Sequence, residues 1–164
     1  MTVEPSEAFA LFYKDNRGPV YRALLAGVLD RDAAEEATAE AFARAFAHWH
    51  AVADHPNPRA WVLRVAWNYH KSCWRTWEGR RVADPPPAAP PAVVQWVDPD
   101  LVDAIGRLPL GQREVLVLVA LGELRPSEAA KVLGPAAGTV RGQLSRARAA
   151  LRQLLDQAQE GHDG

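Results

Sequence analysis

A proline-rich stretch from Val82 to Pro99 divides this chain of 164 residues into two parts. The stretch holds six of the thirteen prolines, and proline can neither donate a backbone hydrogen bond nor sit comfortably inside a helix. It therefore predicts a linker rather than a structured element. In polyproline geometry, which rises about 3.1 Å per residue, the linker would reach on the order of 50 Å, so the two parts could contact separate surfaces of a partner.

Both parts have the apolar spacing of helices, and no segment shows the alternation typical of strands. We therefore expect an all-α chain with two small helical domains, at 1–81 and 100–158, joined by the linker at 82–99. A disordered tail is expected at 159–164. Capping and helix-breaking residues set the boundaries in the N-terminal part: a break at Gly18-Pro19, a helix start at Asp30 or Asp32, a loop over 50–58, and a further helix from about Arg59. The aromatic stripe of Phe42, Phe46 and Trp49 is expected to face the core.

The C-terminal part contains the pattern of a helix-turn-helix. Pro126 suits the first turn of a short helix, and Gly134 suits the left-handed position just past its end. The next helix would start near Gly138 or Thr139 and turn one apolar stripe inward: Val140, Leu144, Ala147 and Leu151. Its outward face would present Arg141, Ser145 and Arg146 to the major groove of DNA, where arginine can bind guanine bidentately. The alternative for such a helix is a merely solvated basic face.

Charge is partitioned along the chain, although the net charge is only −1. Residues 30–40 carry five acids against one base, residues 56–81 carry six bases against one acid, and residues 138–152 carry four arginines and no acid. The basic segment also holds an aromatic stripe: Trp67, His70, Trp74 and Trp77. Flat rings beside cations could stack on unpaired DNA bases, at roughly 1–3 kcal/mol per base, but a buried helix has the same pattern. For Trp61 we prefer a place in the core.

Other functional classes have little support in the sequence. Cys73 is the only cysteine, which excludes an intramolecular disulfide and a thiolate metal cluster. His48, His50 and His55 cluster, but the spacing typical of metal ligands is not completed. We therefore expect no catalytic residue, no metal and no cofactor. The N-terminal residues resemble neither a signal peptide nor a membrane span, so the expected location is the cytoplasm.

Three stretches carry a family resemblance. They are DAAEEATAEAFARAF at 32–46, NPRAWVLRVAWN at 57–68, and LPLGQREVLVLVALGELRPSEAAKVLG at 108–134, which continues into GTVRGQLSRARAAL at 138–151. Together they resemble the extracytoplasmic-function group of the sigma-70 family, the dissociable promoter-recognition subunits of bacterial RNA polymerase. The resemblance spans nearly the whole chain outside the linker, and its last stretch is the most specific. Four positions depart from the family pattern: Ala39, Phe46, Trp67, and Arg125, where a Ser or Thr would cap the following helix.

The resemblance implies three binding surfaces. The acidic helix would bind the clamp coiled coil of the polymerase β′ subunit through Glu35, Glu36, Glu40 and Arg44. The loop at 50–57 and the helix after it would capture a flipped base of the minus-ten element and hold the melted strand through Asn57, Arg64, Asn68, Lys71, Trp74 and Arg75. The helix-turn-helix would read the minus-thirty-five element, with Arg141, Gly142, Ser145 and Arg146 facing bases and Gln143 and Arg148 facing phosphates.

The resemblance also implies partners and leaves one alternative open. Core RNA polymerase, promoter DNA and an anti-sigma factor are the implied partners, and no membrane insertion is expected. The linker would thread towards the polymerase active centre and the RNA exit path. The alternative is a helix-turn-helix transcriptional regulator whose N-terminal part senses a ligand or dimerises. Binding to core polymerase distinguishes the two, because such a regulator should not displace sigma factors.

Overall fold

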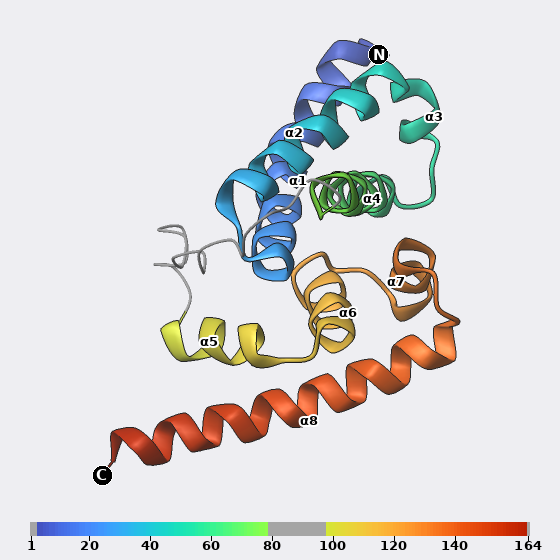
Figure 1. Cartoon of the computed structure of the whole chain (residues 1–164). Helices are drawn as coiled ribbons and strands as arrows, with labels where there is room; N and C mark the ends of the chain where they lie inside the picture. The colour runs from blue at the N-terminus through green and yellow to red at the C-terminus, as the bar shows by residue number, and fades with distance from the viewer. Residues whose placement is uncertain (1–2, 79–97, 164) are drawn as a thin grey trace.

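The computed structural model describes residues 3–78 and 98–163, and its regular structure in these two ranges is entirely α-helical (Figure 1). The N-terminal part holds four helices: α1 (Pro5–Val28), α2 (Arg31–Ala47), α3 (Trp49–Ala53) and α4 (Pro58–Glu78). The C-terminal part holds four more: α5 (Pro99–Arg107), α6 (Leu110–Ala120), α7 (Pro126–Leu133) and α8 (Ala137–His162). The all-α prediction is confirmed. The predicted linker lies outside the described residues, except for its last two positions.

In the N-terminal part, α2 packs along α1, and α4 packs against both. Asp30 caps α2, since its Oδ1 accepts a hydrogen bond from the Ala33 amide at 3.0 Å. The predicted break at Gly18-Pro19 was wrong, because α1 continues through Pro19. Val20 and Leu24 are fully buried directly after the proline, so tertiary packing outweighs the backbone hydrogen bond that proline removes.

The aromatic stripe of the second predicted helix is only partly in the core. Phe42 is buried and Trp49 packs on the core, but Phe46 is 58% exposed, which corrects the prediction for this residue. The Phe46 ring rests on the Phe9 ring, with centroids 5.0 Å apart. The predicted loop over 50–58 also begins as helix α3, which the fully buried Val52 anchors.

The helix-turn-helix forms as the sequence predicts. Helix α7 starts at Pro126 and ends at Leu133, and the φ of 104° at the following Gly134 lies in the left-handed region. Although Arg125 is a poor cap, its backbone N–H donates to Glu128 Oε1 at 3.0 Å. Helix α8 turns the predicted stripe inward, with Val140, Leu144 and Ala147 buried and Leu151 half-buried.

Helix α8 is longer than expected and continues to His162, so residues 159–162 are helical where we expected a disordered tail. Helix α8 packs against α5, and its residues Leu151 and Leu154 pack on the core. His162 Nε2 also lies 3.9 Å from Asp100 Oδ2 near the start of α5. Figure 1 shows α8 running along the whole lower side of the C-terminal part.

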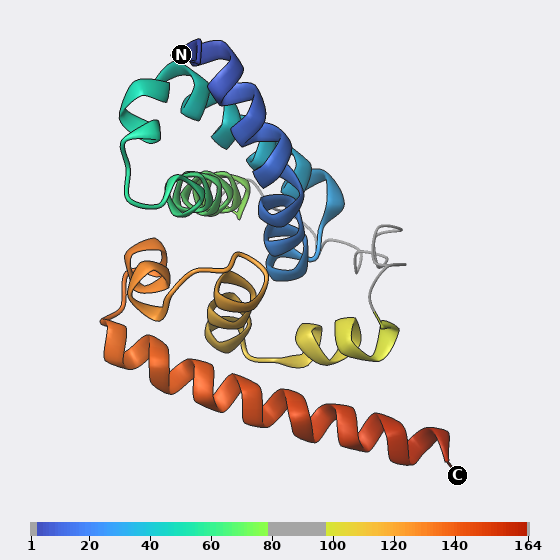
Figure 2. The same ribbon diagram turned by 180° about the vertical axis from the view of Figure 1, so that it is seen from behind.

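The two parts share one hydrophobic core. Helices α1 and α4 pack against α6 and α7, an arrangement that is also visible from behind (Figure 2). Gly27 of α1 sits at the centre of this contact, because a Cβ there would lie 2.3 Å from the Trp67 ring and 3.2 Å from Val117 Cγ2. Only a glycine lets α1, α4 and α6 approach so closely. Within 3–78 and 98–163, none of the helices is long and apolar enough to cross a membrane.

Candidate nucleic-acid and protein interfaces

The outward face of α8 is basic and open to solvent. Arg141, Ser145, Arg146 and Arg148 are exposed, and Gly142 and Gln143 are half-exposed. No acid lies between residues 138 and 152, so nothing on this stretch of the helix neutralises its arginines. The face can donate hydrogen bonds and attract phosphates at the same time.

Two of these positions have more specific surroundings. Arg146 Nη2 lies 3.5 Å from where a Cβ on Gly142 would be, so the guanidinium covers the backbone that the glycine leaves bare. Gln143 Nε2 lies 3.0 Å from the corresponding point on Gly111, at the start of α6. Gln143 therefore lies at the edge of the outward face of α8, beside α6.

The residues expected at the minus-ten surface fall into two groups around α4. Arg64 and Asn68 are exposed. Asn57 and Lys71 instead contact carboxylates of the C-terminal part: Asn57 Nδ2 donates to Glu128 Oε2 at 2.6 Å, and Lys71 Nζ lies 3.4 Å from Glu114 Oε2. The side chains of Trp74 and Arg75 lie outside the described part of the chain.

Asn57 also shapes the local backbone. Its Oδ1 accepts a hydrogen bond from the Ala60 amide at 3.2 Å, in the manner of a helix N-cap. One side chain therefore begins α4 and joins it to α7. Arg59, two residues later, pairs with Glu123 and donates from Nε to Asn16 Oδ1 at 2.7 Å.

Trp67 is buried. Of the two interpretations of the aromatic stripe, base stacking and core packing, the structure shows core packing for this residue. It is 2% exposed, and its indole Nε1 donates to Glu114 Oε2 at 2.6 Å. Glu114 is itself 8% exposed, and a buried carboxylate needs partners. These are the Trp67 indole N–H and the Lys71 ammonium. Trp61 is half-buried against the core, as we preferred.

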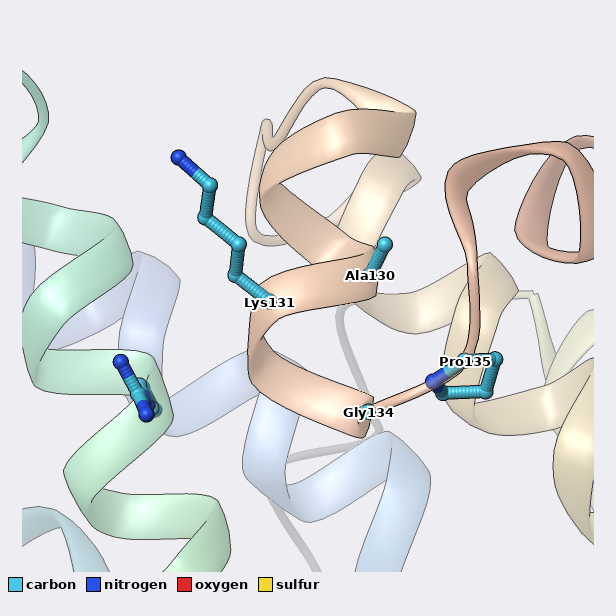
Figure 3. Close-up of a pocket in the computed structure, with 5 residues that line it drawn as sticks. Ala130, Lys131, Gly134 and Pro135 are labelled. Atoms are coloured by element: carbon cyan, nitrogen blue, oxygen red, sulfur yellow. The ribbon is translucent and has the colours of Figure 1, made fainter.

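A hollow of about 360 Å³ lies between α4 and α7. Its lining includes Arg64 from α4 and Lys131, Gly134 and Pro135 from α7 and the turn after it (Figure 3). The two cations meet no acid among the lining residues, so the hollow suits an anionic backbone better than an apolar ligand.

The acidic face of α2 is exposed and loosely paired. Arg31 Nε lies 3.3 Å from Glu35 Oε1, and Arg44 Nε lies 2.9 Å from Glu40 Oε1. Such exposed pairs one helical turn apart contribute only about 0.3–0.5 kcal/mol to stability. A basic partner can therefore replace the arginines as the contact of these glutamates at little cost.

Tyr69 joins this acidic face to α4. Its hydroxyl donates to Glu36 Oε1 at 2.8 Å, and the hydrogen bond to this carboxylate raises the pKa of Tyr69 above its ordinary value. The Arg44 guanidinium lies 5.5 Å from the centroid of the same ring. Next to it, burial lowers the pKa of His70, because it disfavours the charged form of this residue of the basic segment.

Sequence reasoning missed Glu114, Glu123 and Glu128, three acids of the C-terminal part that contact residues at the start and middle of α4. Glu114 carried a signal, because an acid directly before the apolar run of residues 115–121 must find a partner when it is buried. The partners themselves, Trp67 and Lys71, have no such signal, since they lie in the other part of the chain.

Comparison with known proteins adds a separate kind of support. Residues 100–151 match the protein family described as Sigma-70, region 4. The RNA polymerase sigma factor CnrH of Cupriavidus metallidurans is 32% identical over 130 residues, which cover 67% of this chain and 68% of that protein. The RNA polymerase sigma-E factor of Streptomyces antibioticus is 34% identical over 130 residues, which cover 75% of this chain and 71% of that protein.

A solved structure shares the fold. It is that of the sigma factor RpoE in complex with the anti-sigma factor NepR from Bartonella quintana. The TM-score is 0.73 with 20% identity, and the match covers 92% of this chain and 98% of that one. The likeness therefore extends across both helical parts rather than the helix-turn-helix alone.

Proposed function

This chain belongs to the extracytoplasmic-function group of the sigma-70 family and is an RNA polymerase sigma factor, and from this premise we propose how its surfaces recognise a promoter. As a sigma factor it is a transcription initiation factor and not an enzyme. The regulator alternative is thereby set aside. The proposal divides the chain into a region 2 domain at 1–81, a linker at 82–99 and a region 4 domain at 100–158.

The outward face of α8 reads the minus-thirty-five element. This assignment rests on one observation: an exposed, acid-free arginine face is backed by a buried stripe that fixes its orientation. Arg141, Gly142, Ser145 and Arg146 face base edges. Gln143 and Arg148 lie at the borders, where phosphates of the groove pass.

The α4 surface holds the melted minus-ten strand, through Asn57, Arg64, Asn68, Lys71, Trp74 and Arg75. The hollow between Arg64 and Lys131 supports this assignment, because it offers two cations to a phosphate backbone. On α2, the acidic face of Glu35, Glu36, Glu40 and Arg44 binds the β′ clamp coiled coil, where complementary charge mainly sets orientation and encounter rate.

An anti-sigma factor controls this chain in the cytoplasm. The solved structure of a sigma factor with this fold contains an anti-sigma factor, which supports the first half of this proposal. The cytoplasmic location follows from the proposed function, because a sigma factor acts where core polymerase and promoter DNA are. The decisive experiment is run-off transcription of genomic promoters with core polymerase and no other sigma factor, in the presence and absence of this chain. Start sites are mapped by sequencing. Promoter-specific starts that require the chain are expected, and their absence would contradict the proposal.

Replacing Arg146 with alanine should weaken holoenzyme binding to the mapped promoters by about 1–3 kcal/mol, or roughly 5- to 150-fold. The reason is the loss of a bidentate contact with a base edge. Binding is measured by fluorescence anisotropy on cognate and scrambled duplexes over a range of salt concentrations. Arg148→Ala is the matched control, since loss of a phosphate contact should weaken both duplexes alike and lower the salt slope by about 1. If Arg146→Ala also weakens both duplexes equally, Arg146 contacts phosphate instead.

A further inference from the structure

A small hollow lies between α1 and α2, which run side by side (Figure 1). Its volume is about 70 Å³, and its lining includes Tyr13 and Tyr21 from α1 and Glu35, Ala39 and Phe42 from α2. We propose that this hollow receives the end of one uncharged hydrogen-bonding side chain, an asparagine or a glutamine, from the polymerase clamp. The proposal rests on the assignment of α2 as the clamp-binding surface made above.

Tyr21 supplies the first observation. The residue is 9% exposed, and its hydroxyl is buried without a hydrogen bond to any residue in the described ranges. The Arg31 guanidinium interacts with this hydroxyl only weakly, because its main partner is Glu35, whose Oε1 lies 3.3 Å from Arg31 Nε. Buried polar groups normally have a hydrogen-bond partner. An orphaned hydroxyl in the wall of a hollow therefore indicates a partner that arrives from outside.

The hollow opens to the surface beside Ala39. Tyr21, Thr38 and Phe42 form its buried side, whereas Glu35 and Ala39 are exposed. Ala39 is one of the four positions that depart from the family pattern, and its single methyl group leaves the hollow unfilled. Because Glu35 also belongs to the acidic face of α2, a protein docked on that face covers the opening.

Size and charge restrict what can enter. A hollow of about 70 Å³ takes the end of one side chain, whereas pockets for drug-sized ligands measure roughly 300–1,000 Å³. The exposed part of its lining carries one charge of each sign, Arg17 and Glu35, so it favours neither a cation nor an anion. The buried part carries none, and a charged group placed there would lose its hydration without an ionic partner.

The hydrogen-bonding groups of the buried side suit an amide. The Thr38 hydroxyl already donates to the Ala34 carbonyl at 2.7 Å, so it can only accept from an incoming group. The Tyr21 hydroxyl can donate as well as accept, and a side-chain amide has both a carbonyl oxygen and an NH₂ group to match the two. The rings of Tyr13 and Phe42, with centroids 5.1 Å apart, give the methylene groups of the same side chain an apolar wall.

The first variant, Tyr21→Phe in the full chain, removes the orphaned hydroxyl. The melting temperature should stay the same or rise, because phenylalanine fills the same place without an unpaired buried group. Binding to core polymerase should nevertheless fall about three- to tenfold, because the incoming amide loses a hydrogen bond. Circular dichroism and competition with a labelled reference sigma factor measure the two effects. A lower melting temperature would show that the hydroxyl acts within the chain itself and would overturn the proposal, as would unchanged competition.

The second variant, Ala39→Gln, fills the hollow from within the chain. It should raise the melting temperature, because its amide gives Tyr21 a partner, and it should weaken binding to core polymerase at least about tenfold, because the clamp side chain is displaced. Ala47→Gln is the matched control. It adds the same side chain at the exposed last residue of α2, outside the lining of the hollow, and should do neither. Undiminished competition by Ala39→Gln would overturn the proposal.

The combination of the two substitutions tests whether they act through the same contact. The rise in melting temperature caused by Ala39→Gln should disappear in the Tyr21→Phe background, because the new amide then has no hydroxyl to bind. A rise of the same size in both backgrounds would show that a side chain entering beside Ala39 does not reach Tyr21. That result would overturn the proposed geometry.

Reversal of the charges of Glu36 and Glu40, which lie outside the lining, tests the underlying clamp-binding surface separately. If this double reversal impairs competition for core polymerase while the Tyr21 and Ala39 variants compete normally, the proposal for the hollow fails and the assignment of α2 stands. If the double reversal also competes normally, the assignment of α2 fails, and the proposal for the hollow fails with it.

Discussion

Replacing Trp67 with alanine is expected to lower the free energy of unfolding by about 3–5 kcal/mol, a large share of the total for a small domain. The indole is 2% exposed at the junction of α1, α4 and α6, where it contacts Gly27. Its removal leaves a cavity there, and it also leaves Glu114 buried with Lys71 as its remaining described partner. Urea unfolding followed by circular dichroism measures the loss.

Trp67→Phe serves as the matched control for the hydrogen bond. Phenylalanine keeps an aromatic ring in the cavity but cannot donate to Glu114, so a smaller loss of about 1–3 kcal/mol is expected. The difference between the two variants separates packing from hydrogen bonding. A loss below about 1 kcal/mol for Trp67→Ala would contradict the close packing of α4 on α1 and α6, because truncating a buried tryptophan normally costs several times more.

Local patterns in the sequence predicted the helices well. The four-residue and three-residue spacing of Val140, Leu144 and Ala147 fixes which side of α8 is buried, and Gly134 fixes where α7 ends. Asp30 likewise marks the start of α2. Such features depend on residues within one or two turns, so the sequence contains all the information they need.

The errors arose where distant residues decide the outcome. Pro19 breaks many helices, but here the buried residues after it hold α1 together. Phe46 continues the spacing of Phe42, yet it is largely exposed and packs on the Phe9 ring rather than in the core. Periodicity shows which face a residue occupies, but it does not show how far the neighbouring helix extends.

The contacts between the two parts had no local signal at all. Trp67 and Glu114 are 47 positions apart, and Asn57 and Glu128 are 71 apart. Gly27 illustrates the same point, because an ordinary glycine in a helix gives no hint that a tryptophan ring lies against it. The candidate binding residues could therefore be proposed from the sequence, whereas the carboxylates that cover two of them could be found only in the structure.

Reversing two charges on α2, with Glu36→Lys and Glu40→Lys together, is expected to reduce binding to core polymerase by at least about tenfold. The acidic segment at 30–40 would change from net negative to neutral, which removes the complementary charge proposed for the clamp coiled coil. Competition with a labelled reference sigma factor for core polymerase measures the effect. The loss should shrink as salt is added, because screening already weakens the wild-type attraction.

Two controls separate charge from its position and from the local fold. Glu4→Lys with Glu7→Lys makes the same change in net charge at exposed positions near the start of α1, and it should compete for polymerase as the wild type does. Tyr69→Phe removes the hydroxyl that donates to Glu36 and keeps the ring, so any loss it causes measures how far the α2 to α4 contact positions that carboxylate. Undiminished competition by the α2 double variant would reject this surface, because a charge-complementary interface cannot tolerate two reversals at its centre.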